Sequence, residues 1–199
     1  SNDLLNYTFE LINDVLKVNQ IDLKQDIASS VGYQISKNVL LKINTPRLAI
    51  RYANSLSFLI PLLYGEVNIA DLILFEGVKL FYPKHYDFIK NFPEYFIESY
   101  GDVYSRGTDT KKKEEFKQKL DLLNQNLSKH EQNAILDLLK HLFPIIEEPL
   151  NNHSYANGYQ NWTKEKRISS SKYFNRFFLY SIPDNDVSDI YFENFLKGL

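Results

Sequence analysis

Two arginines one helical turn apart, Arg47 and Arg51, are the side chains of this chain best suited to chemistry. They follow a Thr-Pro pair, which is typical of a helix cap and a first helical position. With Asn54 they stand at i, i+4 and i+7, so all three share one side of that helix. A guanidinium presents a planar fork of donors to a phosphate and stabilises charge on a transferring phosphoryl group. Arg47 is therefore the first candidate catalytic residue, against the alternative of a surface ion pair with Glu66 or Asp71.

Glu76 is a second unusual residue, because it lies within an otherwise apolar stretch. An ionised carboxylate in such a place needs a partner or a shifted pKa. Lys79 and Lys84 are the expected partners. The alternative is that Glu76 stands at the edge of a partly exposed helix.

A basic cluster near the carboxyl end is the third candidate site. Lys166, Arg167 and Arg176 lie close in sequence to Trp162 and Tyr173. Basic side chains beside stacking aromatic rings are what single-stranded nucleic acids require. The net charge of -2 does not favour nucleic acid as a general partner. This patch for a nucleic acid or a protein is therefore kept as an alternative.

Other common catalytic patterns are missing from the sequence. There is no GxxxxGK[ST], GxGxxG, GxSxG or HExxH motif. The absence of cysteine excludes disulfides, thiolate metal ligands and thiol nucleophiles. We expect no metal site, because the histidines are scattered; they are His85, His130, His141 and His153.

Composition predicts an aromatic-rich helical protein. The chain has 199 residues, with 14 Tyr and 14 Phe against 7 Gly and 7 Pro, a balance that favours a helical core. No stretch resembles a signal peptide or reaches the roughly 18 apolar residues of a membrane span. We expect a cytoplasmic location and no membrane contact by this chain. The Ser-Asn start and the lack of methionine suggest a piece of a larger protein.

The apolar periodicity predicts a mainly α fold, a multi-helix bundle in two loosely separated lobes. Residues 1–104 form the first lobe, 105–115 an exposed linker, and 116–199 the second lobe with its aromatic and basic end. A short strand pair near 162–169 is allowed. The expected helices are 3–18, an irregular one over 22–41, 46–60, 69–82, two short ones over 86–90 and 94–100, then 116–123, 129–143 and 186–196.

Cap signals support two of these helices. Ser128 and Glu131 form a capping box ahead of an apolar run, and Asn68 with Asp71 resembles one. The apolar residues after Asn68 nearly encircle the helix axis. That pattern predicts a helix buried in the middle of the bundle.

Three sequence blocks together resemble the carboxyl-terminal half of the KAP-family P-loop NTPases. The blocks are TPRLAIRYANSL at 45–56, GEVNIADLILFEGVKLFYP at 65–83 and KRISSSKYFNRFFLYSIPDNDVSD at 166–189. The resemblance implies that a nucleotide-binding core, with ATP and Mg, precedes this chain in the intact protein. This chain would be the helical lid or regulatory part, and the upstream core would be its partner.

The same resemblance gives the two arginines a role. Arg47 matches an arginine that a helical lid offers to the γ-phosphate, and Arg51 would assist in nucleotide binding. This chain alone would bind no cofactor and hydrolyse no nucleotide. The resemblance also suggests an oligomer, a part in bacterial defence, and membrane association only through other parts of the protein. The alternative is a helical protein- or nucleic-acid-binding module without catalysis, and a third possibility is an independent helical domain unrelated to nucleotides.

Overall fold

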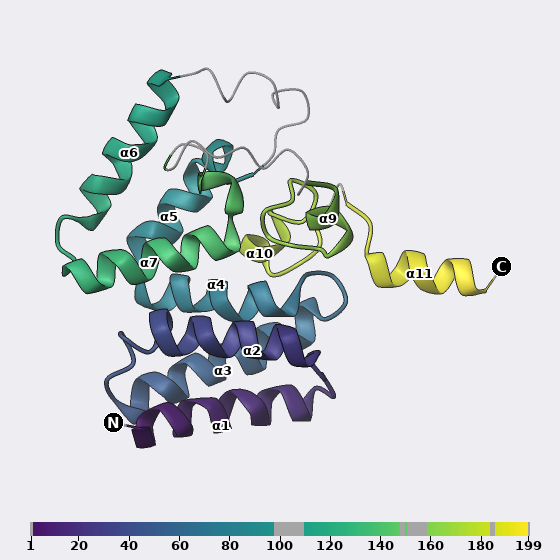
Figure 1. The fold of residues 1–199 in the computed structure, drawn as a ribbon. Helices are drawn as coiled ribbons and strands as arrows, with labels where there is room; N and C mark the ends of the chain where they lie inside the picture. Colours follow the sequence, from purple (N-terminus) through teal and green to yellow (C-terminus); the bar gives the residue numbers. More distant parts are fainter. Residues whose placement is uncertain (1, 98–109, 148–149, 151–158, 184–185, 199) are drawn as a thin grey trace.

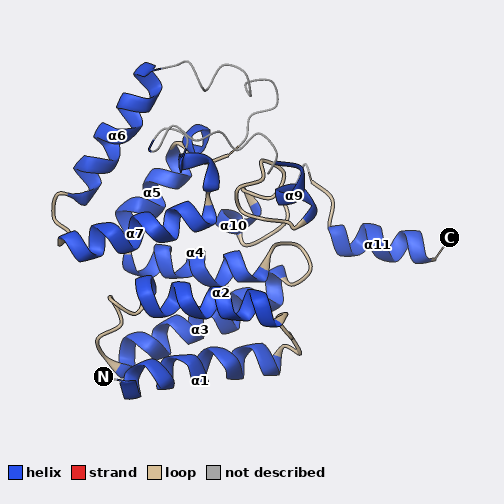
Figure 2. Ribbon diagram, in the orientation of Figure 1, coloured by secondary structure: helices blue, strands red, loops and turns tan. Residues whose placement is uncertain are grey.

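A computed structural model describes residues 2–97, 110–147, 150, 159–183 and 186–198. Within these ranges the chain is helical and contains no strand, as Figure 2 shows. The predicted mainly α, multi-helix fold is therefore confirmed. The strand pair near 162–169 is wrong, because residues Tyr159–Lys164 form a short helix, α9, and turn-type hydrogen bonds follow it. One of these bonds, from the Arg167 amide to the Trp162 carbonyl, folds the chain back on α9 instead of extending it.

The helices of the amino-terminal half form a stack (Figure 1). Helix α1 (Asn2–Val18) packs along α3 (Pro46–Leu63) and buries Ile12 and Val15. Helix α2 (Gln25–Gln34) continues into a π-helical segment, Ile35–Val39. Gly77 lies against this segment, where an added Cβ would meet Val39 at 3.1 Å. The glycine therefore allows the π-helical segment to approach the next helix closely.

Helix α4 (Ile69–Phe81) is the centre of the molecule. Every residue from Asp71 to Val78 is buried. Helix α4 contacts α2 and α3 and also two later helices, α5 (Pro83–Asn91) and α7 (Lys129–Leu142). The Asn68 side chain caps it by accepting from the Asp71 amide at 3.0 Å. The prediction of a buried, capped central helix is confirmed.

Helix α3 runs three residues beyond its predicted end at residue 60. Pro61 lies inside its last turn, although proline cannot donate to the carbonyl of Ser57. Ser57 is on the exposed side of the helix, where water can satisfy that carbonyl. The chain reverses at Gly65, whose φ of +78° is a conformation that suits glycine.

The remaining helices follow α4 along the chain, and two of them, α5 and α7, pack against it. They are α5 (Pro83–Asn91), α6 (Thr110–Asn124), α7 (Lys129–Leu142), α9, α10 (Arg176–Leu179) and α11 (Asp189–Lys197), with 3₁₀ turns at Pro93–Tyr95 and Pro144–Ile146. The Ser128–Glu131 capping box at the start of α7 is confirmed. The predicted linker is partly wrong, because 110–115 belong to α6, whereas 105–109 lie outside the described residues.

The buried side chains of both predicted lobes form one hydrophobic cluster. The ring of Phe75 in α4 contacts the rings of Phe143, Phe177 and Phe178 at centroid distances of 5.2 to 6.3 Å. Phe116 of α6 packs against Phe88 and Phe96 in the same way. The two halves of the chain thus share a core.

Candidate functional site: the arginine face of α3

The first turns of α3 present Arg47 and Arg51 to solvent. Both side chains are exposed, and together with Leu48, Ile50 and Asn54 they line a shallow hollow of about 530 Å³. Neither guanidinium forms an ion pair or hydrogen bond with any residue that the structure describes. We name Arg47, Arg51 and Asn54 the arginine face.

The opposite side of α3 holds this face in place. Tyr52 and Leu56 are fully buried, and the Tyr52 hydroxyl donates to the Ile73 carbonyl of α4 at 2.6 Å. Thr45 caps the helix by accepting from the Leu48 amide at 3.4 Å. The two arginines therefore extend from a helix whose position is fixed by the core, while their own side chains form no ion pair with the described part of the chain.

The competing ion pairs predicted for Arg47 do not form. Glu66 pairs with Arg176 at 2.8 Å and Asp71 with Arg167 at 3.0 Å. Glu66 follows the carboxyl end of α3, and Asp71 lies in α4. Arg47, in contrast, is in the first turn of α3. The alternative of a surface ion pair with Glu66 or Asp71 is wrong.

Glu76 of α4 is hydrogen-bonded to α3 at Ser55, one turn after Arg51. It is 2% exposed, its Oε1 accepts from the Ser55 hydroxyl at 2.5 Å, and Lys79 Nζ lies 3.4 Å away. Burial raises the pKa of Glu76, and Ser55, Lys79 and Arg51 oppose this shift. The predicted partner Lys79 is confirmed. Ser55 is not among the predicted partners, although its position one turn after Arg51 is an available signal.

Arg176 is buried in a network that anchors α11. It is 0% exposed, and it donates to the Glu66 carboxylate at 2.8 Å and to Asp186 at 2.8 Å. The Glu66 carboxylate also accepts from the backbone amides of Asp189 and Ile190 at 2.9 and 3.2 Å. These are the first amides of α11, where a carboxylate is favourable. Glu66 thus joins the end of α3 to the start of α11.

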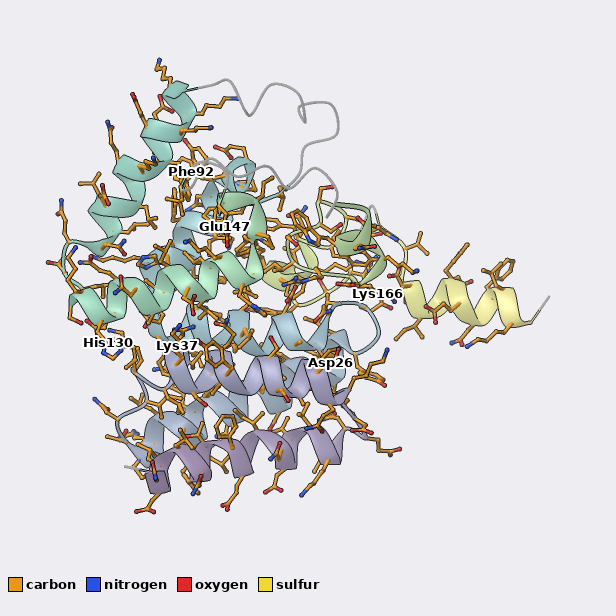
Figure 3. All side chains as sticks on the ribbon, in the orientation of Figure 1. Asp26, Lys37, Phe92, His130, Glu147 and Lys166 are labelled. Carbon is orange, nitrogen blue, oxygen red and sulfur yellow. The ribbon has the colours of Figure 1, made fainter. Side chains whose placement is uncertain are left out.

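Arg167 and Lys166 also have partners within the chain. Arg167 donates to both oxygens of Asp71 and to the His141 carbonyl. Lys166, near the start of α11 in Figure 3, donates to the Gly65 carbonyl at 2.6 Å and pairs with Asp189 at 3.3 Å. The three cations proposed for a partner patch therefore hold loops and helices together and do not form an exposed basic surface.

The three histidines that the structure describes do not form a cluster that could hold a metal ion. His85 is buried and lies 3.0 Å from the Asn124 side-chain oxygen, and burial lowers its pKa. Burial, followed by the nearby Arg167 cation, lowers the pKa of His141. Among the described residues no three carboxylates or histidines are placed to hold a metal ion, and His153 lies outside them.

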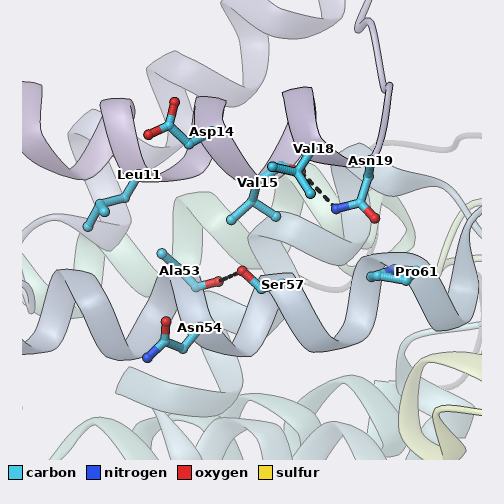
Figure 4. A pocket seen from close by; sticks show the side chains of 9 residues that line it. All are labelled: Leu11, Asp14, Val15, Val18, Asn19, Ala53, Asn54, Ser57 and Pro61. Carbon is cyan, nitrogen blue, oxygen red and sulfur yellow. Dashed lines mark hydrogen bonds between the residues drawn. The ribbon is translucent and has the colours of Figure 1, made fainter.

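A groove between α1 and α3 is the other hollow beside this face. Its volume is about 290 Å³, and Figure 4 shows Leu11, Val15 and Val18 of α1 opposite Ala53 and Pro61 of α3. The lining contains one carboxylate, Asp14, and no cation. The groove therefore lacks the charge that a phosphate ligand needs.

Comparison with known proteins gave no relative. No family model, curated protein or solved structure matches the chain. In the part of the chain that the structure describes, no helix combines the length and the apolar character that crossing a bilayer requires.

Proposed function

We propose that this chain is the helical lid of a P-loop ATPase. In this proposal Arg47 contacts the γ-phosphate of a nucleotide that is bound by a nucleotide-binding core elsewhere in the same protein. The observation that carries this proposal is the unpaired, exposed arginine face on a helix fixed by the core. Arg167 and Arg176, by contrast, are paired with carboxylates. Two guanidinium groups that form no ion pair with a carboxylate of the described residues are suited to an incoming anion.

The residues of this chain supply only part of such a site. Arg47 and Arg51 provide fixed positive charge for phosphate oxygens. The sequence contains no GxxxxGK[ST] loop, and the described residues contain no cluster of acidic side chains or histidines for a cation. Cradling the β-phosphate and holding Mg are therefore assigned to the upstream core, and this chain contributes orientation and charge.

The positions of the two arginines support a separate task for each in this proposal. Arg47 is in the first turn of α3, where the helix amino terminus adds favourable charge for an anion. Arg51 lies one turn further and is near the buried Glu76 carboxylate, which interacts with it electrostatically. We therefore assign phosphate sensing to Arg47 and a supporting charge to Arg51.

Turnover of the longer polypeptide tests this proposal. Arg47→Ala removes a charge that acts on the transferring phosphoryl group, so kcat should fall about 10³-fold or more. Lys17→Ala, which removes an exposed cation from α1, is the matched control and should leave kcat unchanged. An Arg47→Ala variant with wild-type turnover and an unchanged far-UV spectrum would refute the proposal.

A further inference from the structure

Helix α11 is short and is not packed into the core. It has nine residues, none of which is buried, and every residue from Ile190 to Gly198 is exposed. Figure 1 shows the helix extending outward from the bundle. A free helix needs about 12–15 residues to be even marginally stable in water. Neither its length nor apolar packing against the described residues therefore explains why α11 is helical.

The first turn of α11 is held by side chains. The first amides of any helix have no acceptor within the helix itself. The Asp189 and Ile190 amides donate to the Glu66 carboxylate at 2.9 and 3.2 Å, and the Tyr191 amide donates to the Ser188 hydroxyl at 3.0 Å. This hydroxyl in turn donates to Glu66 at 2.5 Å. A carboxylate from a distant part of the chain thus completes the first turn.

Glu66 is itself fixed in the body of the molecule. It is 3% exposed, and its partner Arg176, at 2.8 Å, is 0% exposed. Arg176 also holds the residues before α11, because it donates to the Asp186 carboxylate at 2.8 Å and to the Val187 carbonyl at 3.0 Å. The chain is therefore anchored to the body from Asp186 to Ile190.

The later turns of α11 have a weaker connection to the body. Among the described residues, one ion pair joins them to it, between Lys166 Nζ and the Glu193 carboxylate at 3.6 Å. The Glu193 side chain is exposed, and ion pairs of exposed groups contribute little stability. A helix extends readily once its first turn has formed. The later turns therefore depend on the first one.

We propose that α11 is a conditional helix, which forms only while Glu66 holds its first turn. The unfavourable step of forming a first turn is offset by the hydrogen bonds to Glu66 and by its negative charge at the helix start. Without these bonds residues 191–197 should become coil while the core helices remain. Glu66 lies between α3 and α4. The turn between these two helices therefore controls an order–disorder transition of the kind that conformational switches use.

Hydrogen exchange of residues 1–199, followed by NMR without nucleotide, tests this inference independently of the proposed ATPase function. Ser188→Ala removes a cap and a bond to Glu66 but leaves the pair of Glu66 with Arg176 intact. The two losses together should make the amides of residues 193–197 exchange at least about ten times faster. Ser128→Ala, which removes the equivalent cap from α7, is the matched control and should leave the exchange of α11 unchanged.

Glu66→Gln tests the carboxylate itself. In this variant the Cα chemical shifts of residues 191–197 should move from helical to coil values. The fluorescence of the buried Trp162 should stay at its wild-type value, because the core remains folded. If Glu66→Gln does not fold, the exchange rates of Ser188→Ala decide.

Three results would overturn the proposal. The first is wild-type exchange of α11 in Ser188→Ala. The second is an equal acceleration of α11 exchange by Ser128→Ala, since α11 would then open only together with the whole chain. The third is a folded Glu66→Gln chain in which residues 191–197 keep their helical shifts.

Discussion

Glu76 is the residue whose environment most affects how stability depends on pH. It is buried in α4 and accepts from Ser55 next to Lys79, and burial raises its pKa above the ordinary value of 4.5. The protonated form is therefore favoured by folding. The stability that Glu76 contributes is complete below the ordinary carboxyl pKa and is lost as pH rises through the raised pKa.

Replacing Glu76 by Gln should remove that loss. The free energy of unfolding of Glu76→Gln should be measured by denaturant titration from about pH 4 to about pH 8. It should fall less with rising pH than that of the wild type, because glutamine has no carboxyl proton to lose. Glu131 provides a contrast of opposite sign, because hydrogen bonds from Lys42 and Ser128 lower its pKa to about 2. Its contribution is present above the ordinary carboxyl pKa and is lost toward pH 2. Identical pH profiles for wild type and Glu76→Gln would contradict this account.

The sequence could predict some of these residues and not others. The exposed positions of Arg47 and Arg51 follow from helical periodicity alone. The burial of Arg176 does not, because its partner Glu66 is 110 residues away and only the folded chain brings them together. An arginine in an aromatic run therefore indicates a surface patch when the sequence is considered alone, although carboxylate partners neutralise this one in the interior.

At the scale of the helices, local sequence signals are sufficient to predict helix caps and the burial of a helix. The caps at Asn68 and Ser128 and the burial of α4 are predictable because hydrogen-bonding side chains and apolar periodicity act within one element. The continuation of α3 past Pro61 and the π-helical segment beside Gly77 are not predictable from local signals. Both depend on contacts or exposure that a neighbouring helix determines.

Glu66 connects two helices, and its removal should be costly. Glu66→Ala leaves Arg176 as a buried cation with fewer partners and removes the carboxylate from the start of α11. The free energy of unfolding should fall by about 3–5 kcal/mol, as for other broken buried pairs. Glu10→Ala, on the exposed side of α1, is the control and should change it by less than about 0.5 kcal/mol. Equal unfolding midpoints for the two variants would show that the network contributes no stability.

At the scale of the whole molecule, the aromatic cluster around Phe75 joins the two predicted lobes. Sequence patterns predict the helices of each half but not their common core, because contacts between distant aromatic rings leave no periodic signal. A shared core favours a single cooperative unfolding transition.

Two probes can measure this cooperativity. Trp162 is the only tryptophan; it lies in the second half and is buried, so its fluorescence reports on that half, whereas far-UV circular dichroism reports on all helices. Both signals should change with the same denaturant midpoint. Midpoints that differ would mean that the halves unfold separately, and the single-core description would then be wrong.

The central claim is that Arg47 senses a γ-phosphate, and the preference for ATP over ADP tests it most directly. In the longer polypeptide, titration with fluorescent nucleotides should show that Arg47→Ala loses about ten- to a hundredfold of that preference, the effect of one hydrogen bond to a charged group. Lys17→Ala should retain the wild-type preference. If Arg47→Ala discriminates between ATP and ADP as well as the wild type does, the arginine face does not contact the γ-phosphate.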